Sequence, residues 1–132
     1  YIPSEKEEFM NPKQIEYFKN LLNSWKNDLL KGSSTTISNL KEESSNKPDN
    51  ADRASIESER SLELRTRDRE RKLISKINKA LRKIEEGTYG YCEDTNEPIS
   101  IKRLMARPIA TLSLEAQESH EKSEKIYKEK EY

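Results

Sequence analysis

The sequence of 132 residues is 31% hydrophobic and 38% charged, which leaves room for one domain with a small core. Lys plus Arg number 25, as do Asp plus Glu, so the sequence lacks the net positive charge of a general nucleic-acid or membrane binder. Its single cysteine excludes an intramolecular disulfide, and the lack of a long apolar run predicts a cytoplasmic protein.

The first half of the sequence predicts a long helix after a short lead segment. Residues 1–10 carry a proline and charges without a helical period, and we expect them to be extended. Asn11 can cap a helix whose first residue is Pro12. Apolar side chains then recur at intervals of three and four residues, the spacing of a coiled-coil seam, at Ile15, Phe18, Leu22, Trp25 and Leu29.

A second seam predicts that the chain folds back on itself. It comprises Ile74, Ile77, Leu81 and Ile84 and ends just before Gly87, a typical helix stop. In an antiparallel pair, facing residues have a constant sum of residue numbers. The sum here is 99 for Ile15 with Ile84, Phe18 with Leu81, Leu22 with Ile77 and Trp25 with Ile74, and it extends to Ile37 with Leu62.

The midpoint of this pairing falls at Asp49 and Asn50, inside the turn-forming run Lys47-Pro48-Asp49-Asn50. The sequence therefore predicts an antiparallel coiled-coil hairpin over residues 11–87, about 50 Å long, with its tip near residues 47–54. The fold class is all-α dominated.

The last third of the sequence changes character twice. Residues 88–112 are rich in apolar and turn-forming side chains and predict a small globular region. Residues 113–132 are polar and predict a C-terminal helix. The expected packing residues of the globular region are Tyr89, Tyr91, Ile99, Ile101, Leu104 and Leu112.

Two charged features are candidates for binding. Asp49 and Asp52 lie three residues apart at the predicted tip, where they either cap the second helix or meet a metal ion or a partner. Nine basic residues lie between Arg65 and Lys83, against two acidic ones. This run fits a solvated helix face, and it equally fits a phosphate-bearing ligand or an acidic protein surface.

Other chemistry has little support in the sequence. Thr95 stands three residues after Cys92, where a second cysteine would complete half of a structural zinc site, so Cys92 is a single thiolate ligand without its partner. His120 is predicted to be a surface imidazole on a polar helix. We find no nucleophile with an evident base and no glycine-rich phosphate loop, and so expect that the protein is not an enzyme and holds no metal or resident cofactor.

Several motifs resemble the DksA/TraR family of RNA-polymerase-binding transcription factors. They are residues 61–74 (SLELRTRDRERKLI), the tip pattern Asp49-x-x-Asp52-Arg53-Ala54, residues 90–93 (GYCE) and residues 103–108 (RLMARP). The resemblance implies a coiled coil that enters the secondary channel of bacterial RNA polymerase. It also implies that the protein destabilises open promoter complexes with the alarmone ppGpp in the stringent response, repressing ribosomal RNA promoters and aiding those for amino-acid biosynthesis.

The resemblance assigns roles to particular residues. Asp49, Asp52 and Ala54 match the tip that acts on the polymerase, and the alarmone site shared with the polymerase is matched by Leu73, Lys76 and Arg107. Gln117 stands where a lysine is usual. The family's zinc ligands correspond to Cys92, Thr95, Ser113 and Ala116, so the chain looks like a zinc-independent variant in which Cys92 is the remnant.

The expected partners are bacterial RNA polymerase and ppGpp, with no specific DNA binding, no membrane and a monomeric chain. Two other classes of protein remain open. A transcript-cleavage factor of the Gre type also presents an acidic hairpin, although about 45 residues after Gly87 are few for its globular domain. A generic coiled-coil scaffold is the other alternative.

Overall fold

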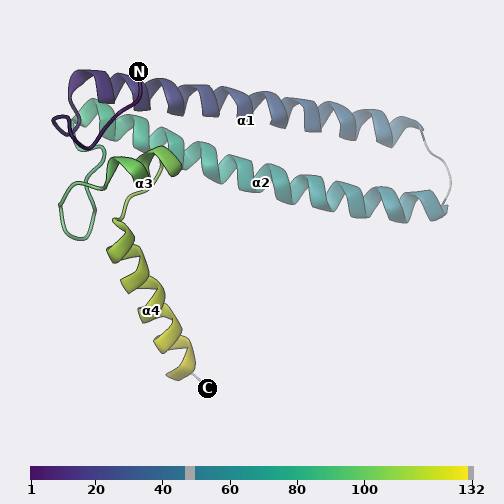
Figure 1. Ribbon diagram of the computed structural model, residues 1–132. Helices are drawn as coiled ribbons and strands as arrows, with labels where there is room; N and C mark the ends of the chain where they lie inside the picture. Colours follow the sequence, from purple (N-terminus) through teal and green to yellow (C-terminus); the bar gives the residue numbers. More distant parts are fainter. Residues whose placement is uncertain (47–49, 131–132) are drawn as a thin grey trace. The chain divides into compact units, whose positions relative to one another are not determined.

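The computed structural model describes the backbone of residues 1–46 and 50–130 and the side chains of residues 1–32 and 54–128. The helices of this described part are α1 (Pro12–Asn46), α2 (Asn50–Glu86), α3 (Ile101–Ala106) and α4 (Leu114–Lys130) (Figure 1). Within it there is no strand, only an isolated bridge between Tyr91 and Pro98. The all-α prediction is confirmed. Among the described residues, no helix is both long enough and apolar enough to span a membrane.

The chain divides into two units, which are described separately. The first unit combines residues 1–22 with residues 80–132, and the second comprises residues 23–79. In each unit a stretch of α1 runs antiparallel to a stretch of α2 (Figure 1), so the hairpin predicted from the two seams is present.

The start of α1 and the end of α2 are fixed by the capping residues that the sequence predicts. The Asn11 side-chain oxygen accepts a hydrogen bond from the backbone amide of Gln14 at 2.9 Å, and Pro12 is the first helical residue. At the other end, Gly87 follows the last residue of α2 with φ of +78°, and the Thr88 amide donates back to the Lys83 carbonyl at 2.9 Å. Both predicted boundaries are confirmed.

The nine seam residues are all buried or half-buried, and Phe18, Leu22 and Ile77 are fully so. This burial agrees with the predicted register, whose individual pairs stay predictions. Leu62 does not belong to the seam, because 61% of it is exposed. It lies 12 residues before Ile74, about a third of a turn off the buried face. Ile56, 18 residues or five turns before Ile74, is the buried residue on that face.

The lead segment is fastened to α1 rather than extended throughout. Turns occupy residues 5–6 and 9–10, with a bend at residue 7, which corrects the expectation for residues 1–10. The fully buried Gln14 accepts a hydrogen bond from the Met10 amide at 2.8 Å and donates one to the Ser4 carbonyl at 3.1 Å. The buried side-chain amide of Gln14 therefore pairs with two backbone polar groups of the lead segment and holds the segment against α1.

Residues 88–112 form a small core, as expected, with two differences. Tyr91, predicted to be buried, is 38% exposed. It stands between buried Gly90 and Cys92 in extended backbone, where successive side chains face opposite sides. Leu112 is half-buried rather than central. The prediction missed the buried Cys92, Pro108, Ile109 and Ala116, and it was right for Tyr89, Ile99, Ile101 and Leu104.

Candidate functional site

Residues 90–99 form a tight knuckle around Cys92. The Cys92 amide donates to the Glu97 carbonyl and the Asn96 amide donates back to the Cys92 carbonyl, both at 2.8 Å. The Ile99 amide donates to the Gly90 carbonyl at 2.7 Å and closes the knuckle. These bonds fix the direction of the Cys92 side chain, which is fully buried.

The Cys92 sulfur is surrounded by hydrogen-bond donors. Burial alone raises the pKa of the thiol, but hydrogen bonds from the Ser113 amide, the Thr95 hydroxyl and the amides of Thr95 and Asp94 outweigh it. Together they bring the pKa from its ordinary 9.0 down to about 6. These N–H and O–H groups favour the thiolate over the neutral thiol, as donor groups favour bound anions elsewhere in proteins.

The four positions of the family's zinc pattern do come together in the structure. Thr95 and Ser113 lie close enough to the Cys92 sulfur to lower its pKa, and the Ser113 hydroxyl accepts from the Ala116 amide at 3.2 Å. These residues do not fit a C4 zinc site. Ala116 has no ligand atom, the Ser113 hydroxyl already caps α4, and one thiolate is far from the four ligands that structural zinc takes.

Two side-chain contacts, an ion pair and a histidine–carboxylate hydrogen bond, fasten the knuckle to neighbouring helices. Lys83 near the end of α2 contacts Glu93 at 2.6 Å, and His120 of α4 contacts Asp94 at 2.6 Å. The expectation of a surface imidazole holds for His120, whose side chain is 52% exposed, but the sequence did not reveal its partner. A 26-residue separation leaves no local signal for such a contact.

The acidic tip stays a prediction. Asp49 lies outside the described residues, and for Asp52 only the backbone, in the first turn of α2, is described. Ala54 lies on α2 and is exposed. Each therefore remains a candidate for contact with a partner.

The residues assigned to the alarmone site belong to different units. In the second unit, Leu73 is half-buried and Lys76 is exposed, one helical turn apart on α2. In the first unit, Arg107 is exposed and caps the C-terminus of α3, its amide donating to the Arg103 carbonyl at 2.7 Å. Their convergence on one ligand stays a prediction. Gln117 is half-buried, and its side-chain amide donates to Glu121 at 3.3 Å.

The basic run of α2 contains a stripe that the sequence analysis did not separate out. Its members within the second unit are exposed and recur at intervals of four and three residues: Arg65, Arg69, Lys72, Lys76 and Lys79. Each stands two residues after a seam position, about 200° around the helix, so the stripe lies opposite the buried face. The 3.5-residue period was the signal available in the sequence.

Comparisons with known proteins agree with this architecture. The model of the family described as "DnaK suppressor protein DksA, N-terminal domain" matches residues 14–84. The model described as "Prokaryotic dksA/traR C4-type zinc finger" matches residues 87–122. The second match includes the knuckle, although only one of the four cysteines that its name implies is present.

Individual relatives and a solved structure are similar along most of the chain. The chain is 58% identical over 129 residues to "RNA polymerase-binding transcription factor DksA" of Caulobacter vibrioides, covering 98% of this chain and 91% of that protein. It is 46% identical over 119 residues to the protein of that name from Escherichia coli K12, covering 90% and 79%.

The structure described as "Structure of transcription factor DksA2 from Pseudomonas aeruginosa" is 38% identical and matches with a TM-score of 0.82 over 89% of this chain and 90% of that one. The two family models together span most of the sequence, and these relatives cover nearly all of it. The chain therefore belongs to the DksA/TraR family.

Proposed function

We propose that this protein binds bacterial RNA polymerase through the secondary channel and regulates transcription by destabilising open promoter complexes. The observation that carries the proposal is the 58% identity to an RNA polymerase-binding transcription factor over 98% of the chain. The exposed cationic stripe of α2 adds support, because a row of like charges disfavours the isolated helix and suits an acidic protein surface.

In this proposal the hairpin tip changes the activity of the polymerase, and the rest of the protein provides the surface that binds the polymerase. Asp49, Asp52 and Ala54 approach the catalytic region of the polymerase, and the two carboxylates disturb the contacts that keep the promoter open. Leu73, Lys76 and Arg107 form the protein's side of a ppGpp site shared with the polymerase. The two basic side chains bind phosphate oxygens through charge-assisted hydrogen bonds. The expected outcome is repression of ribosomal RNA promoters and support of amino-acid biosynthetic ones.

The test separates binding from action. Asp52→Asn removes a charge and keeps the size of the side chain, so we expect unchanged competition for core polymerase but loss of the shortened open-complex lifetime at a ribosomal RNA promoter. Glu57→Gln, an exposed charge on the same helix, is the matched control and should behave as wild type. Wild-type inhibition by Asp52→Asn would contradict the proposed role of the tip.

The proposed ppGpp site is tested separately. Lys76→Ala and Arg107→Ala should each remove the additional inhibition produced by ppGpp while leaving the inhibition without ppGpp largely intact. Lys6→Ala, an exposed lysine of the lead segment, is the control. If the wild type shows no ppGpp effect, Gln117→Lys should create one, since it restores the charge that is usual in the family.

The same preparations distinguish the alternatives. A Gre-type factor would stimulate transcript cleavage in backtracked complexes with a catalytic metal ion. A generic coiled-coil scaffold would not bind core polymerase, and its behaviour would not depend on the tip sequence. The match of both family models to this chain favours the DksA type of function over these two.

A further inference from the structure

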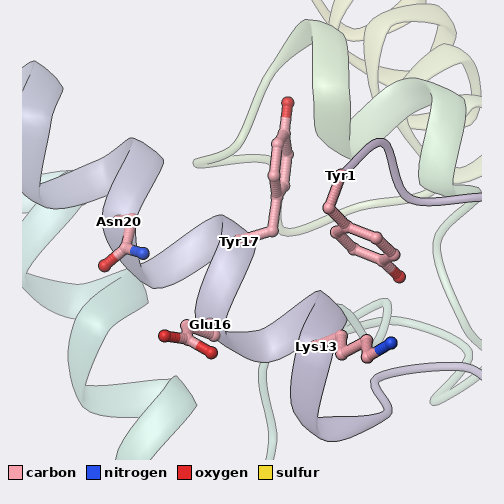
Figure 2. Close-up of a pocket in the computed structure, with 5 residues that line it drawn as sticks. All are labelled: Tyr1, Lys13, Glu16, Tyr17 and Asn20. Carbon is pink, nitrogen blue, oxygen red and sulfur yellow. The ribbon is translucent and has the colours of Figure 1, made fainter.

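A surface cavity of about 320 Å³ lies on the first unit (Figure 2), and its lining contains no residue of the knuckle and none assigned to polymerase or ppGpp. Four lining residues, Lys13, Glu16, Tyr17 and Asn20, come from consecutive turns of α1, and Tyr1 comes from the lead segment. Ligand pockets usually measure about 300 to 1,000 Å³. This cavity therefore suits a single side chain rather than a large cofactor.

The aromatic wall of the cavity is anchored in the core. The rings of Tyr1 and Tyr17 meet edge to face, with centroids 6.4 Å apart. Tyr17 in turn packs edge to face on Phe18 at 5.3 Å, and Phe18 is fully buried. Because this chain of rings fixes Tyr17 before any ligand arrives, little ordering is needed on binding.

The polar side chains of the cavity carry one charge of each sign, on Lys13 and Glu16. Glu16 and Asn20 lie one turn apart on α1, and Figure 2 shows them on one side of the cavity, with Lys13 on the other. Lys13 is near enough to the Glu7 carboxylate to attract it electrostatically. The pKa of Glu7 is lowered first by a hydrogen bond from the Tyr1 hydroxyl, then by one from Asn11, and further by Lys13. Glu16 supplies the carboxylate in the lining of the cavity.

We propose that this cavity binds the guanidinium group of an arginine side chain presented by a partner protein. The planar group stacks on Tyr17, donates to the Glu16 carboxylate through its fork of N–H groups, and has the Asn20 side-chain oxygen as a further acceptor. A lysine fits less well, because its ammonium is more strongly hydrated and cannot form the bidentate pair. The inference does not depend on polymerase binding.

The test uses the full chain and small probes. N-acetyl-arginine amide is titrated into the ¹⁵N-labelled protein, and we expect saturable shifts at the amides of residues 13–20 with a dissociation constant of about 1 mM, as for a small polar ligand. N-acetyl-citrulline amide, which has nearly the same shape without the charge, should bind at least about tenfold more weakly.

Variants locate the site. Glu16→Gln should weaken binding of the arginine probe about tenfold, whereas Glu8→Gln, an exposed carboxylate that does not line the cavity, should leave it unchanged. Both positions are exposed, and circular dichroism should confirm that both variants fold. Equal binding of citrulline, unchanged binding by Glu16→Gln, or the absence of saturable shifts would each overturn the proposal. Binding of N-acetyl-glutamate amide in preference to the arginine probe would also overturn it, since Lys13 would then dominate.

Discussion

Gly90 and Gly87 form a natural pair for testing how the lead segment packs on the globular region. Both have positive φ, +90° and +78°, which costs a residue with a Cβ about 1 to 2 kcal/mol. Only Gly90 is also crowded. A Cβ there would lie 2.9 Å from a ring carbon of Phe9 and 3.1 Å from the terminal methyl of Met10, whereas nothing lies within 4 Å at Gly87.

The two alanine substitutions should therefore differ. Gly87→Ala should lower the free energy of unfolding by about 1 to 2 kcal/mol, and Gly90→Ala by about 2 to 5 kcal/mol, because overpacking adds about 1 to 3 kcal/mol. Urea denaturation followed by circular dichroism measures both. Phe9→Leu, made alone and with Gly90→Ala, completes a double-mutant cycle in which the smaller side chain should restore part of the loss. Equal losses at the two glycines would refute the packing of Phe9 over Gly90.

Three further predictions concern metal and the hairpin. The purified protein should contain no stoichiometric zinc, and a chelator should leave its melting temperature unchanged; one zinc per chain by metal analysis would contradict this. Ile74→Ala should cost about 2 to 4 kcal/mol and alter the fluorescence of Trp25, its predicted partner, so near-wild-type stability would disprove the register. Glu63→Leu should stabilise the protein by about 1 to 3 kcal/mol, because one Glu63 carboxylate oxygen is buried without a hydrogen-bond partner among the described residues, whereas exposed Glu59→Leu should change little.

The parts of the fold predicted well are those encoded by local signals. Asn11 and Pro12 start α1 and Gly87 follows α2 because capping and positive φ depend on one or two residues. The seams were found because a coiled-coil surface repeats every 3.5 residues. The pairing rule, a constant sum of residue numbers, was wrong at Leu62. It selected an apolar residue that lies about a third of a helical turn away from the seam and is exposed. Glu63, half-buried, stands there instead.

The parts missed depend on contacts between distant segments. Nothing near Asp94 in the sequence indicates His120, and the pKa of Cys92 is lowered by Ser113, 21 residues further on. The lead segment had no periodic signal, so neither its attachment through Gln14 nor the cavity under Tyr1 could be predicted. Such contacts depend on how helices and loops that are distant in the sequence pack together, and the local preference of a residue for helix or turn does not predict them.

The thiolate of Cys92 should make stability depend on pH in a defined direction. The folded pKa, about 6, is below the ordinary 9.0 expected in the unfolded chain. Between these values the unfolded state binds more protons than the folded state, so the free energy of unfolding should rise with pH through this window. The stabilisation is fully present above pH 9.0 and is lost as the pH falls through about 6.

The comparison with Cys92→Ser isolates this contribution, because serine keeps a hydrogen-bonding side chain that does not ionise in this range. Free energies of unfolding are measured for both proteins at intervals between pH 5.5 and 9.5, and the difference between them removes every other titrating group. We expect the advantage of the wild type to grow as the pH rises from 6 to 9, with a matching rise in thiolate absorbance of the folded protein near pH 6. Parallel stability curves would mean that the sulfur is held as a neutral thiol. The donors around it would then contribute to the fold as ordinary hydrogen bonds.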